Sequence, residues 1–353
     1  MENESNNANN FLKRGDKENS VTIITDNVLK TVRNYLKKEG FTEILPPTIT
    51  LIAAEDPSTL FGFQYYNHGA AYLSQTAQPY LESNIPALKK VYSISPTYRN
   101  EDIVSRKHLS EFWALEVEQG FCDMENSMNF LENLFSHVIL TVIDQNCKEL
   151  QLLKRNISAL ENHVKLPIKR LTYNQAIEYH NERLRHIKRE IKIEETTTTP
   201  EHLELINLVK QGKITEIKWG EKFSSEQEDI LCDGLGIPFF VTDFPVKARP
   251  FYMKPNSDNP NITLSYDMFA PFAGELVTGG ERINDYKLLL QRIDERNLPR
   301  WAYDWYVDLR KYDHVQEVGF EMGIERLLMV ITGFLDIRDV TQYPRVSDRR
   351  PYP

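Results

Sequence analysis

The sequence predicts an α+β fold in which an antiparallel sheet is flanked by helices. Two runs of alternating polar and apolar residues, 91–98 and 112–118, enclose a polar loop and therefore predict two antiparallel strands. Apolar residues at helical spacing predict helices over about 23–38, within 124–153 and over 324–331. A chain of 353 residues with 41% hydrophobic content is long enough for one large domain with inserts.

The first strand pair predicts a charged sheet face with an apolar face behind it. Arg99 shares a face with the serines that precede it, and Phe112 opens the corresponding face of the return strand. The opposite faces carry Tyr92 and Ile94 on one strand and Leu115 on the other. A guanidinium suits a phosphate and a flat ring suits a base, so this face carries the groups that a nucleotide site needs.

The composition indicates a soluble intracellular enzyme. The net charge of −9 disfavours a general nucleic-acid binder, which is usually basic. No apolar run approaches the ~18 residues of a membrane span, and no signal peptide opens the chain. Cys122, Cys147 and Cys232 lie too far apart for a metal knuckle, so we expect buried thiols in the reducing cytoplasm. A Walker loop and a dinucleotide fingerprint are both absent from the sequence, which disfavours P-loop and Rossmann sites.

Local composition predicts where the folded domain begins and ends and where it carries an insert. Residues 1–20 are polar and rich in asparagine, so we expect a disordered tail before a folded domain over 21–353. A variable insert is expected at about 180–200, and its segment 183–192 is basic. Such a run is most often a solvated helix face, and the alternative is a contact with an acidic partner or an RNA backbone.

Four segments carry a family resemblance. Residues 95–112, SPTYRNEDIVSRKHLSEF, resemble motif 2 of the class II aminoacyl-tRNA synthetases, in the form of the aspartate/asparagine branch. Residues 319–345 are similar to motif 3, the segments 266–269 and 274–282 resemble the metal- and substrate-binding strand pair, and residues 40–47, GFTEILPP, look like the dimer-forming motif 1. The resemblance implies a class II synthetase-like core of six or seven antiparallel strands in a homodimer. It is closest to asparaginyl-tRNA synthetase without the anticodon-binding barrel, as in the archaeal asparagine synthetase-related proteins.

The resemblance implies that ATP binds on the charged sheet face. Arg99 would contact the α-phosphate, and Phe112 and Arg326 would enclose the adenine. Arg99 and Arg326 are therefore the expected catalytic residues. Glu101 would hold the edge or the amine of the adenine, and His108 would approach the γ-phosphate. The alternative for His108 is a purely structural role.

The resemblance also implies a metal site on the neighbouring strand pair. Asp267 and Glu275 would bind Mg²⁺, since carboxylate oxygens are the ligands that this ion prefers, and Glu275 would also face the ATP. The alternative is that both carboxylates pair with surface lysines, as most carboxylates do.

Six residues are expected to bind the amino acid: Glu55, Gln75, Gln78, Arg282, Glu317 and Glu321. Glu55 resembles a glutamate that holds the α-ammonium, and Arg282 can grip a side-chain carboxylate or amide oxygen. Leu81 stands where the aspartate-specific enzymes have lysine, so the pattern is of the asparagine type. Glu317 and Glu321 replace a histidine and a glycine of the family pattern, and their even spacing places them on one strand face. Buried carboxylates need a cationic partner, here a substrate amine, an ammonium ion or Arg282.

Three functions are compatible with these residues. The first is a tRNA-independent ligase that activates aspartate, or a relative, as an acyl adenylate and forms an amide with ammonia or another amine. The second is a truncated synthetase that transfers its amino acid to tRNA or protein. The third is a non-catalytic paralogue that senses an amino acid or a nucleotide. The first is favoured, because the ATP contacts are retained and no barrel precedes motif 1.

Overall fold

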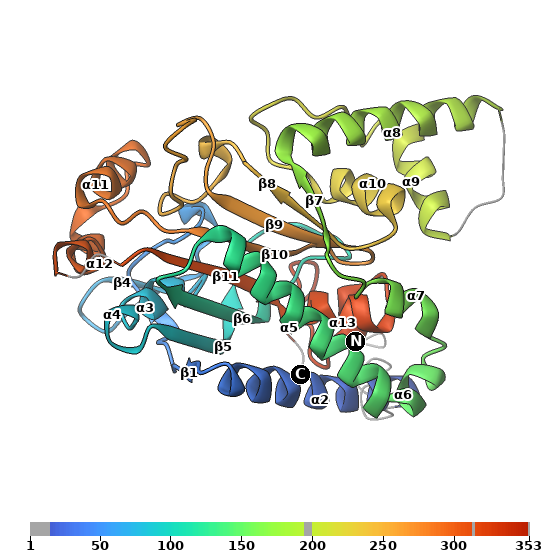
Figure 1. Cartoon of the computed structure of the whole chain (residues 1–353), viewed down its shortest axis with the longest axis horizontal. Helices are drawn as coiled ribbons and strands as arrows, with labels where there is room; N and C mark the ends of the chain where they lie inside the picture. The colour runs from blue at the N-terminus through green and yellow to red at the C-terminus, as the bar shows by residue number, and fades with distance from the viewer. Residues whose placement is uncertain (1–14, 194–199, 313–314, 352–353) are drawn as a thin grey trace.

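The computed structural model describes residues 15–193, 200–312 and 315–351, and its centre is an eight-stranded mixed sheet (Figure 1). In spatial order the strands are β1 (Thr42–Glu43), β5 (Lys90–Tyr98), β6 (Glu111–Gly120), β11 (Glu317–Gly323), β10 (Gly274–Glu281), β9 (Ser265–Ala270), β8 (Phe239–Thr242) and β7 (Lys169–Thr172). A separate three-stranded sheet contains β2 (Ile49–Thr50), β4 (Ala70–Leu73) and β3 (Gly62–Gln64).

The sheet corrects the predicted number and direction of the strands. The strands from β5 to β8 are antiparallel as predicted, but β1 runs parallel to β5 and β7 runs parallel to β8. Parallel neighbours need a crossover connection, and the chain supplies one at each edge. The small sheet lies between β1 and β5 in the sequence, and three helices lie between β7 and β8.

Three amphipathic helices form the main core with the apolar face of the sheet (Figure 1). They are α2 (Asp16–Lys38), α5 (Met124–Gln145) and α13 (Ile324–Thr332). Helix α5 begins where the Asp123 carboxylate accepts the backbone N–H of Asn126, and α13 ends at Gly333, whose φ of 76° favours glycine. Helix α2 includes residues 16–20 of the expected tail, while residues 1–14 lie outside the described residues.

The chain between β7 and β8, which includes the segment 180–200 where an insert was expected, forms a helical subdomain. It contains α8 (Tyr173–Ile193), α9 (Pro200–Lys210) and α10 (Ser225–Leu235), which share a small apolar core. The basic segment 183–192 is partly neutralised within the protein, because Arg183 pairs with Asp233 at 3.0 Å and Arg185 with Glu216 at 3.7 Å. Lys188 is exposed to solvent.

The remaining helices are short connections or a second layer around a separate apolar core. They are α3 (Gln78–Glu82), α4 (Ile85–Leu88), α6 (Cys147–Leu152), α7 (Ile157–Asn162), α11 (Tyr286–Glu295) and α12 (Arg300–Tyr312). Among the described residues, no helix combines the length and apolar character needed to cross a membrane. Of the three cysteines only Cys232 is buried, so the expectation of three buried thiols is wrong; Cys147 is exposed near the start of α6.

Candidate active site

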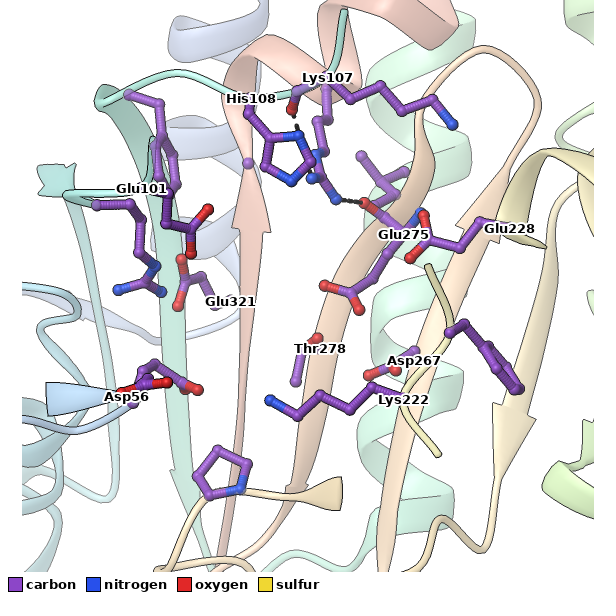
Figure 2. A pocket seen from close by; sticks show the side chains of 18 of the residues that line it. Asp56, Glu101, Lys107, His108, Lys222, Glu228, Asp267, Glu275, Thr278 and Glu321 are labelled. Atoms are coloured by element: carbon purple, nitrogen blue, oxygen red, sulfur yellow. Dashed lines mark hydrogen bonds between the residues drawn. The ribbon is translucent and has the colours of Figure 1, made fainter. Parts of the chain in front are cut away.

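A cavity of about 330 Å³ lies on the polar face of the sheet. Its wall comes from the loop between β5 and β6, the strands β9, β10 and β11, and the first turn of α13 (Figure 2). The predicted division of the strand faces is confirmed, because Tyr92, Ile94 and Leu115 lie in the core on the other side. All but three of the expected site residues line this cavity. The exceptions are Gln75, Arg282 and Glu317.

Arg99 is held rigidly at the end of β5. Its backbone N–H donates to the carbonyl of Ser110 at 3.0 Å, and its Nη1 donates to the carbonyl of Gln75 at 2.6 Å. The Gln75 side chain lies behind the cavity wall, where its amide nitrogen donates to the carbonyl of Asp56 and its oxygen accepts the N–H of Glu55. Gln75 therefore positions Arg99 and the Glu55 loop, and does not contact the cavity as expected.

Arg326 connects two walls of the cavity. From the first turn of α13, its guanidinium donates to the carbonyls of Glu275 on β10 and Lys107 in the β5–β6 loop. Phe112 also lines the cavity. Among the described residues, Arg326 and Phe112 make no direct cation–π contact with each other. A base enclosed between the two side chains requires that they do not touch.

The β5–β6 loop is fixed by contacts to the helical subdomain. Arg106 pairs with Glu204 of α9 at 2.5 Å, and Lys107 pairs with Asp229 of α10. His108 lies in the cavity wall, where burial and then Arg326 lower the pKa of its imidazole. It is hydrogen-bonded through Nδ1 to the hydroxyl of Ser105, so its ring is oriented.

One side of the cavity gathers carboxylates. Figure 2 shows Glu228, Glu275 and Asp267 together on this side. Asp267 pairs with Arg249 at 2.7 Å through Oδ2, while its buried Oδ1 has no hydrogen-bond partner among the described residues. Burial raises the pKa of Asp267 to about 7, against the pull of Arg249. The predicted alternative, pairing with surface lysines, is excluded for Asp267.

These carboxylates suit a partly hydrated Mg²⁺ ion better than they suit a metal held entirely by protein ligands. Among the described residues no group of three or more His, Cys, Asp and Glu side chains has metal-binding geometry. Magnesium normally keeps several waters and binds through one or two carboxylates together with substrate phosphates. The unpaired oxygen of Asp267 and the Glu275 side chain beside the cavity meet that requirement.

Sequence reasoning missed several residues of the wall. Lys107, Lys222 and Glu228 line the cavity; Lys222 and Glu228 point towards it in Figure 2, whereas the Lys107 side chain runs along its edge to Asp229. Glu228 accepts the backbone N–H of Glu275 at 2.9 Å, and burial raises its pKa to about 7, with a further contribution from the Glu275 carboxylate. The sequence offered a weak signal for Glu228, since it belongs to an acidic stretch at the start of α10, but only the tertiary fold brings that helix to β10.

The end of the cavity where the amino acid is expected, called the amino-acid end below, is lined by Glu55, Gln78, Tyr252 and Glu321. The hydroxyl of Tyr252 donates to the side-chain oxygen of Gln78 at 3.0 Å and contacts a carboxylate oxygen of Glu55 at 3.3 Å. Glu321 lies on β11 opposite Thr278 of β10 in the sheet register. Acceptor oxygens therefore predominate at this end.

Arg282 and Glu317 belong to a buried network beneath the cavity, which corrects their expected place. The Arg282 guanidinium donates to Glu118 on β6, and Glu317 lies 3.4 Å from Arg310 of α12. Gly319 makes this pairing possible, because a Cβ at that position would lie 2.0 Å from the Glu118 carboxylate. The expected alternative of an Arg282–Glu321 salt bridge is therefore wrong.

The sheet order, the strand–loop–strand that carries Arg99 and the strand–helix that carries Arg326 together define a family. The sequence model of the family of class II tRNA synthetases for aspartate, lysine and asparagine (D, K and N) matches residues 2–347. The chain therefore belongs to that family. Its members for asparagine and aspartate are AMP-forming ligases, and this chain is an enzyme of that type. Its catalytic core is accordingly consistent with aminoacyl-adenylate formation.

Solved structures give the same result. Asparaginyl-tRNA synthetase from Pyrococcus horikoshii, complexed with asparaginyl-adenylate, is 32% identical with a TM-score of 0.82, over 96% of this chain and 70% of that one. The asparaginyl-tRNA synthetase of Entamoeba histolytica is 32% identical with a TM-score of 0.79, over 95% and 69% of the two chains. Aspartyl-tRNA synthetase from Entamoeba histolytica shares the fold, with 24% identity, a TM-score of 0.70 and coverage of 94% and 59%.

Proposed function

We propose that this enzyme activates the carboxylate of aspartate, or of a related amino acid, as an acyl adenylate and forms an amide with ammonia or another amine, without tRNA. The observation that supports the amide is the acidic amino-acid end of the cavity. Glu55 and Glu321 line it, whereas the guanidinium of Arg282 is occupied by Glu118. A cavity end with this charge attracts an ammonium group.

In the first step the substrate carboxylate attacks the α-phosphorus of ATP and pyrophosphate departs. Negative charge grows on the non-bridging oxygens, and the guanidinium of Arg99 is already held in place to stabilise it. Phe112 and Arg326 hold the base between them. Asp267 and Glu275 would hold Mg²⁺, which supplies further positive charge at the phosphates.

In the second step the nitrogen nucleophile attacks the acyl carbon and AMP leaves. The carboxylates of Glu55 and Glu321 would attract the amine to the amino-acid end, while Tyr252 fixes Glu55 and Gln78. No nucleic acid takes part in either step. The net charge of −9 supports this part of the proposal, since tRNA affinity requires a large basic surface.

The second candidate is transfer of the activated amino acid to tRNA, and the 32% identity to asparaginyl-tRNA synthetases favours it. A non-catalytic sensor is disfavoured, because the cavity keeps Arg99, Phe112 and Arg326 together with the acidic side chains.

Product analysis tests the proposal. The enzyme is incubated with ATP and a panel of amino acids, with and without ammonium, and separately with total tRNA, and the products are identified by mass spectrometry. We expect AMP, pyrophosphate and an ammonium-dependent amide. Formation of ADP, or product only in the presence of tRNA, would exclude the proposed reaction.

We further propose a cytoplasmic homodimer that joins through α2 and residues 40–47. Large apolar side chains support this surface, because Leu45 is 90% exposed and Ile23 is 49% exposed in the single chain. Sedimentation should give a dimer at micromolar concentration, and Leu45→Arg should shift it towards the monomer. A wild-type monomer under those conditions would exclude the dimer. The described cysteines are free thiols, which supports a reducing compartment.

A further inference from the structure

Glu321 has a special position on β11. Side chains alternate along the strand, so Glu321 shares its face with Gly319 and Gly323 on either side, while Phe320 and Met322 point into the main core. Gly319 and Gly323 have no side chains, so at this point β11 presents only the Glu321 carboxylate to the cavity.

The carboxylate of Glu321 is open to a ligand. Among the described residues, no hydrogen bond or ion pair engages it, although it lies in the cavity wall. Its neighbour in the sheet register, Glu116, is fully occupied, because it accepts the N–H of Ala77 at 2.8 Å and the hydroxyl of Thr76. Glu55 is likewise in contact with the hydroxyl of Tyr252.

Charged groups surround Glu321 unequally. Burial and then the carboxylate of Glu116 raise the pKa of Glu321 to about 8; Glu55 and Glu275 act in the same direction, and Arg99 opposes them. Figure 2 shows Glu321 on the same side of the cavity as Glu101, across from Glu275 and Asp267. Its carboxylate therefore lies across the cavity from the expected metal ligands, and Arg99 is the cation that acts on it.

The proposed reaction needs a proton acceptor at that place. Ammonia and alkylamines are largely protonated at neutral pH, and a protonated nitrogen has no lone pair with which to attack the acyl carbon. In the proposed reaction Arg99 would hold the phosphate to which that carbon is bonded. Arg99 acts on the charge of Glu321, so a base at Glu321 would lie on the same side as the reacting bond. A carboxyl group whose pKa lies near the working pH transfers protons efficiently.

We infer that Glu321 is the general base of amide formation, which binds the ammonium form of the nucleophile and removes its proton; this rests on the proposed function. The carboxylate takes one proton and leaves the neutral amine. The nitrogen lone pair then forms the C–N bond, and the bond between the acyl carbon and the phosphate oxygen breaks, with its electrons, to release AMP. The second proton of the nitrogen passes to the AMP phosphate or to water.

Two nucleophiles separate this role from a merely structural one. Acyl adenylate is formed first, and then either ammonium or hydroxylamine is added at the same pH; hydroxylamine is already neutral there and needs no base. Glu321→Gln should lower the rate with ammonium about 100-fold, in the range of general-base catalysis, but the rate with hydroxylamine less than about 5-fold. Pyrophosphate exchange is measured as a third rate, because it reports adenylate formation before the nitrogen attacks. Glu182→Gln, on the exposed face of α8, is the control and should leave all three rates unchanged.

Rescue and pH dependence complete the test. Glu321→Asp keeps the carboxylate and should retain at least about a tenth of the wild-type rate with ammonium. This expectation does not depend on the folding of the Gln variant. The ammonium rate of the Gln variant should rise steadily with pH as free ammonia increases, whereas the wild-type rate should level off. Equal losses with both nucleophiles, or a loss confined to pyrophosphate exchange, overturn the inference alone. A wild-type enzyme that makes no acyl adenylate overturns the proposed function and this inference together.

Discussion

Two neighbouring groups of charges lie on either side of the cavity floor, and each contains residues that were expected to contact the amino acid. The lower group is a buried network in which Arg282 and Arg310 meet the carboxylates of Glu82, Glu118 and Glu317. The upper group lines the cavity, where Glu55 and Glu321 lie with Arg99. The lower group satisfies its own charges, whereas the upper group leaves a carboxylate without a partner.

The balance of the lower group follows from its burial. Burial and the nearby carboxylate of Glu82 raise the pKa of Glu317 well above its ordinary range. Each guanidinium has a close carboxylate partner, Glu118 for Arg282 and Glu82 for Arg310. Charges that compensate one another support the floor, and a charge that lacks a partner is available to a ligand.

The largest expected effect comes from breaking the buried network. Arg282→Ala removes one guanidinium and leaves Glu118 buried without its partner, which should cost about 3–5 kcal/mol of unfolding free energy. Urea denaturation measures it. Arg185→Ala is the matched control, since its pair with Glu216 is exposed and should contribute less than about 1 kcal/mol. If Arg282→Ala folds with wild-type stability but fails to bind the amino acid, Arg282 contacts the substrate after all.

The next effect concerns two cations that line the cavity, Arg99 of the upper group and Arg326. Arg99→Ala and Arg326→Ala should each lower the rate of AMP formation at least about 100-fold, because each removes an electrostatic stabiliser from an enclosed site. Stability should change less than in Arg282→Ala. Arg99→Lys keeps the charge but loses the planar donor arrangement, so it should recover only part of the rate. Full activity in either Ala variant, or ADP as the product, would contradict the assignment.

The fold shows which patterns a sequence can carry. The alternation that predicted β5 and β6 and the helical spacing of α2, α5 and α13 are confirmed, since long amphipathic segments report their buried faces directly. The parallel pairing of the edge strands escaped prediction because β1 has two residues and β7 has four. Segments that short contain no readable alternation, and tertiary contacts decide their pairing.

The site shows a second limit. Alternation correctly placed Glu317 and Glu321 on one strand face, but it does not tell how deep each lies. The depth depends on Gly319, which has no side chain. The Glu118 carboxylate occupies the space beside this glycine and pairs with Arg282 below the cavity. Lys107 and Glu228 escaped prediction because their positions depend on the packing of α10 against β10.

A smaller effect should appear in the pH dependence of stability. The pKa of Glu321 is raised from its ordinary value of 4.5 to about 8 in the folded chain. Folding therefore favours the protonated form, so its contribution is complete below pH 4.5 and is lost as the pH rises through about 8. Glu321→Gln should be more stable than wild type by about 1–3 kcal/mol at high pH, with water in the cavity reducing the full effect. Equal pH profiles in urea denaturation would show that the carboxyl titrates normally.

The smallest expected effect concerns the basic segment of α8, whose inner side is neutralised by Asp233 and Glu190. Lys188 and Arg189 remain exposed, and no ion pair among the described residues engages them. The double change Lys188→Glu and Arg189→Glu should alter stability by less than about 0.5 kcal/mol, as is usual for surface positions. Amide formation with ammonium should keep its rate, with or without added tRNA. A phosphate-binding surface behaves differently, because reversing two of its cations weakens nucleic-acid binding steeply and reduces the salt dependence. A loss of product that appears only when tRNA is present would therefore identify α8 as an RNA contact and favour transfer to tRNA over the amide.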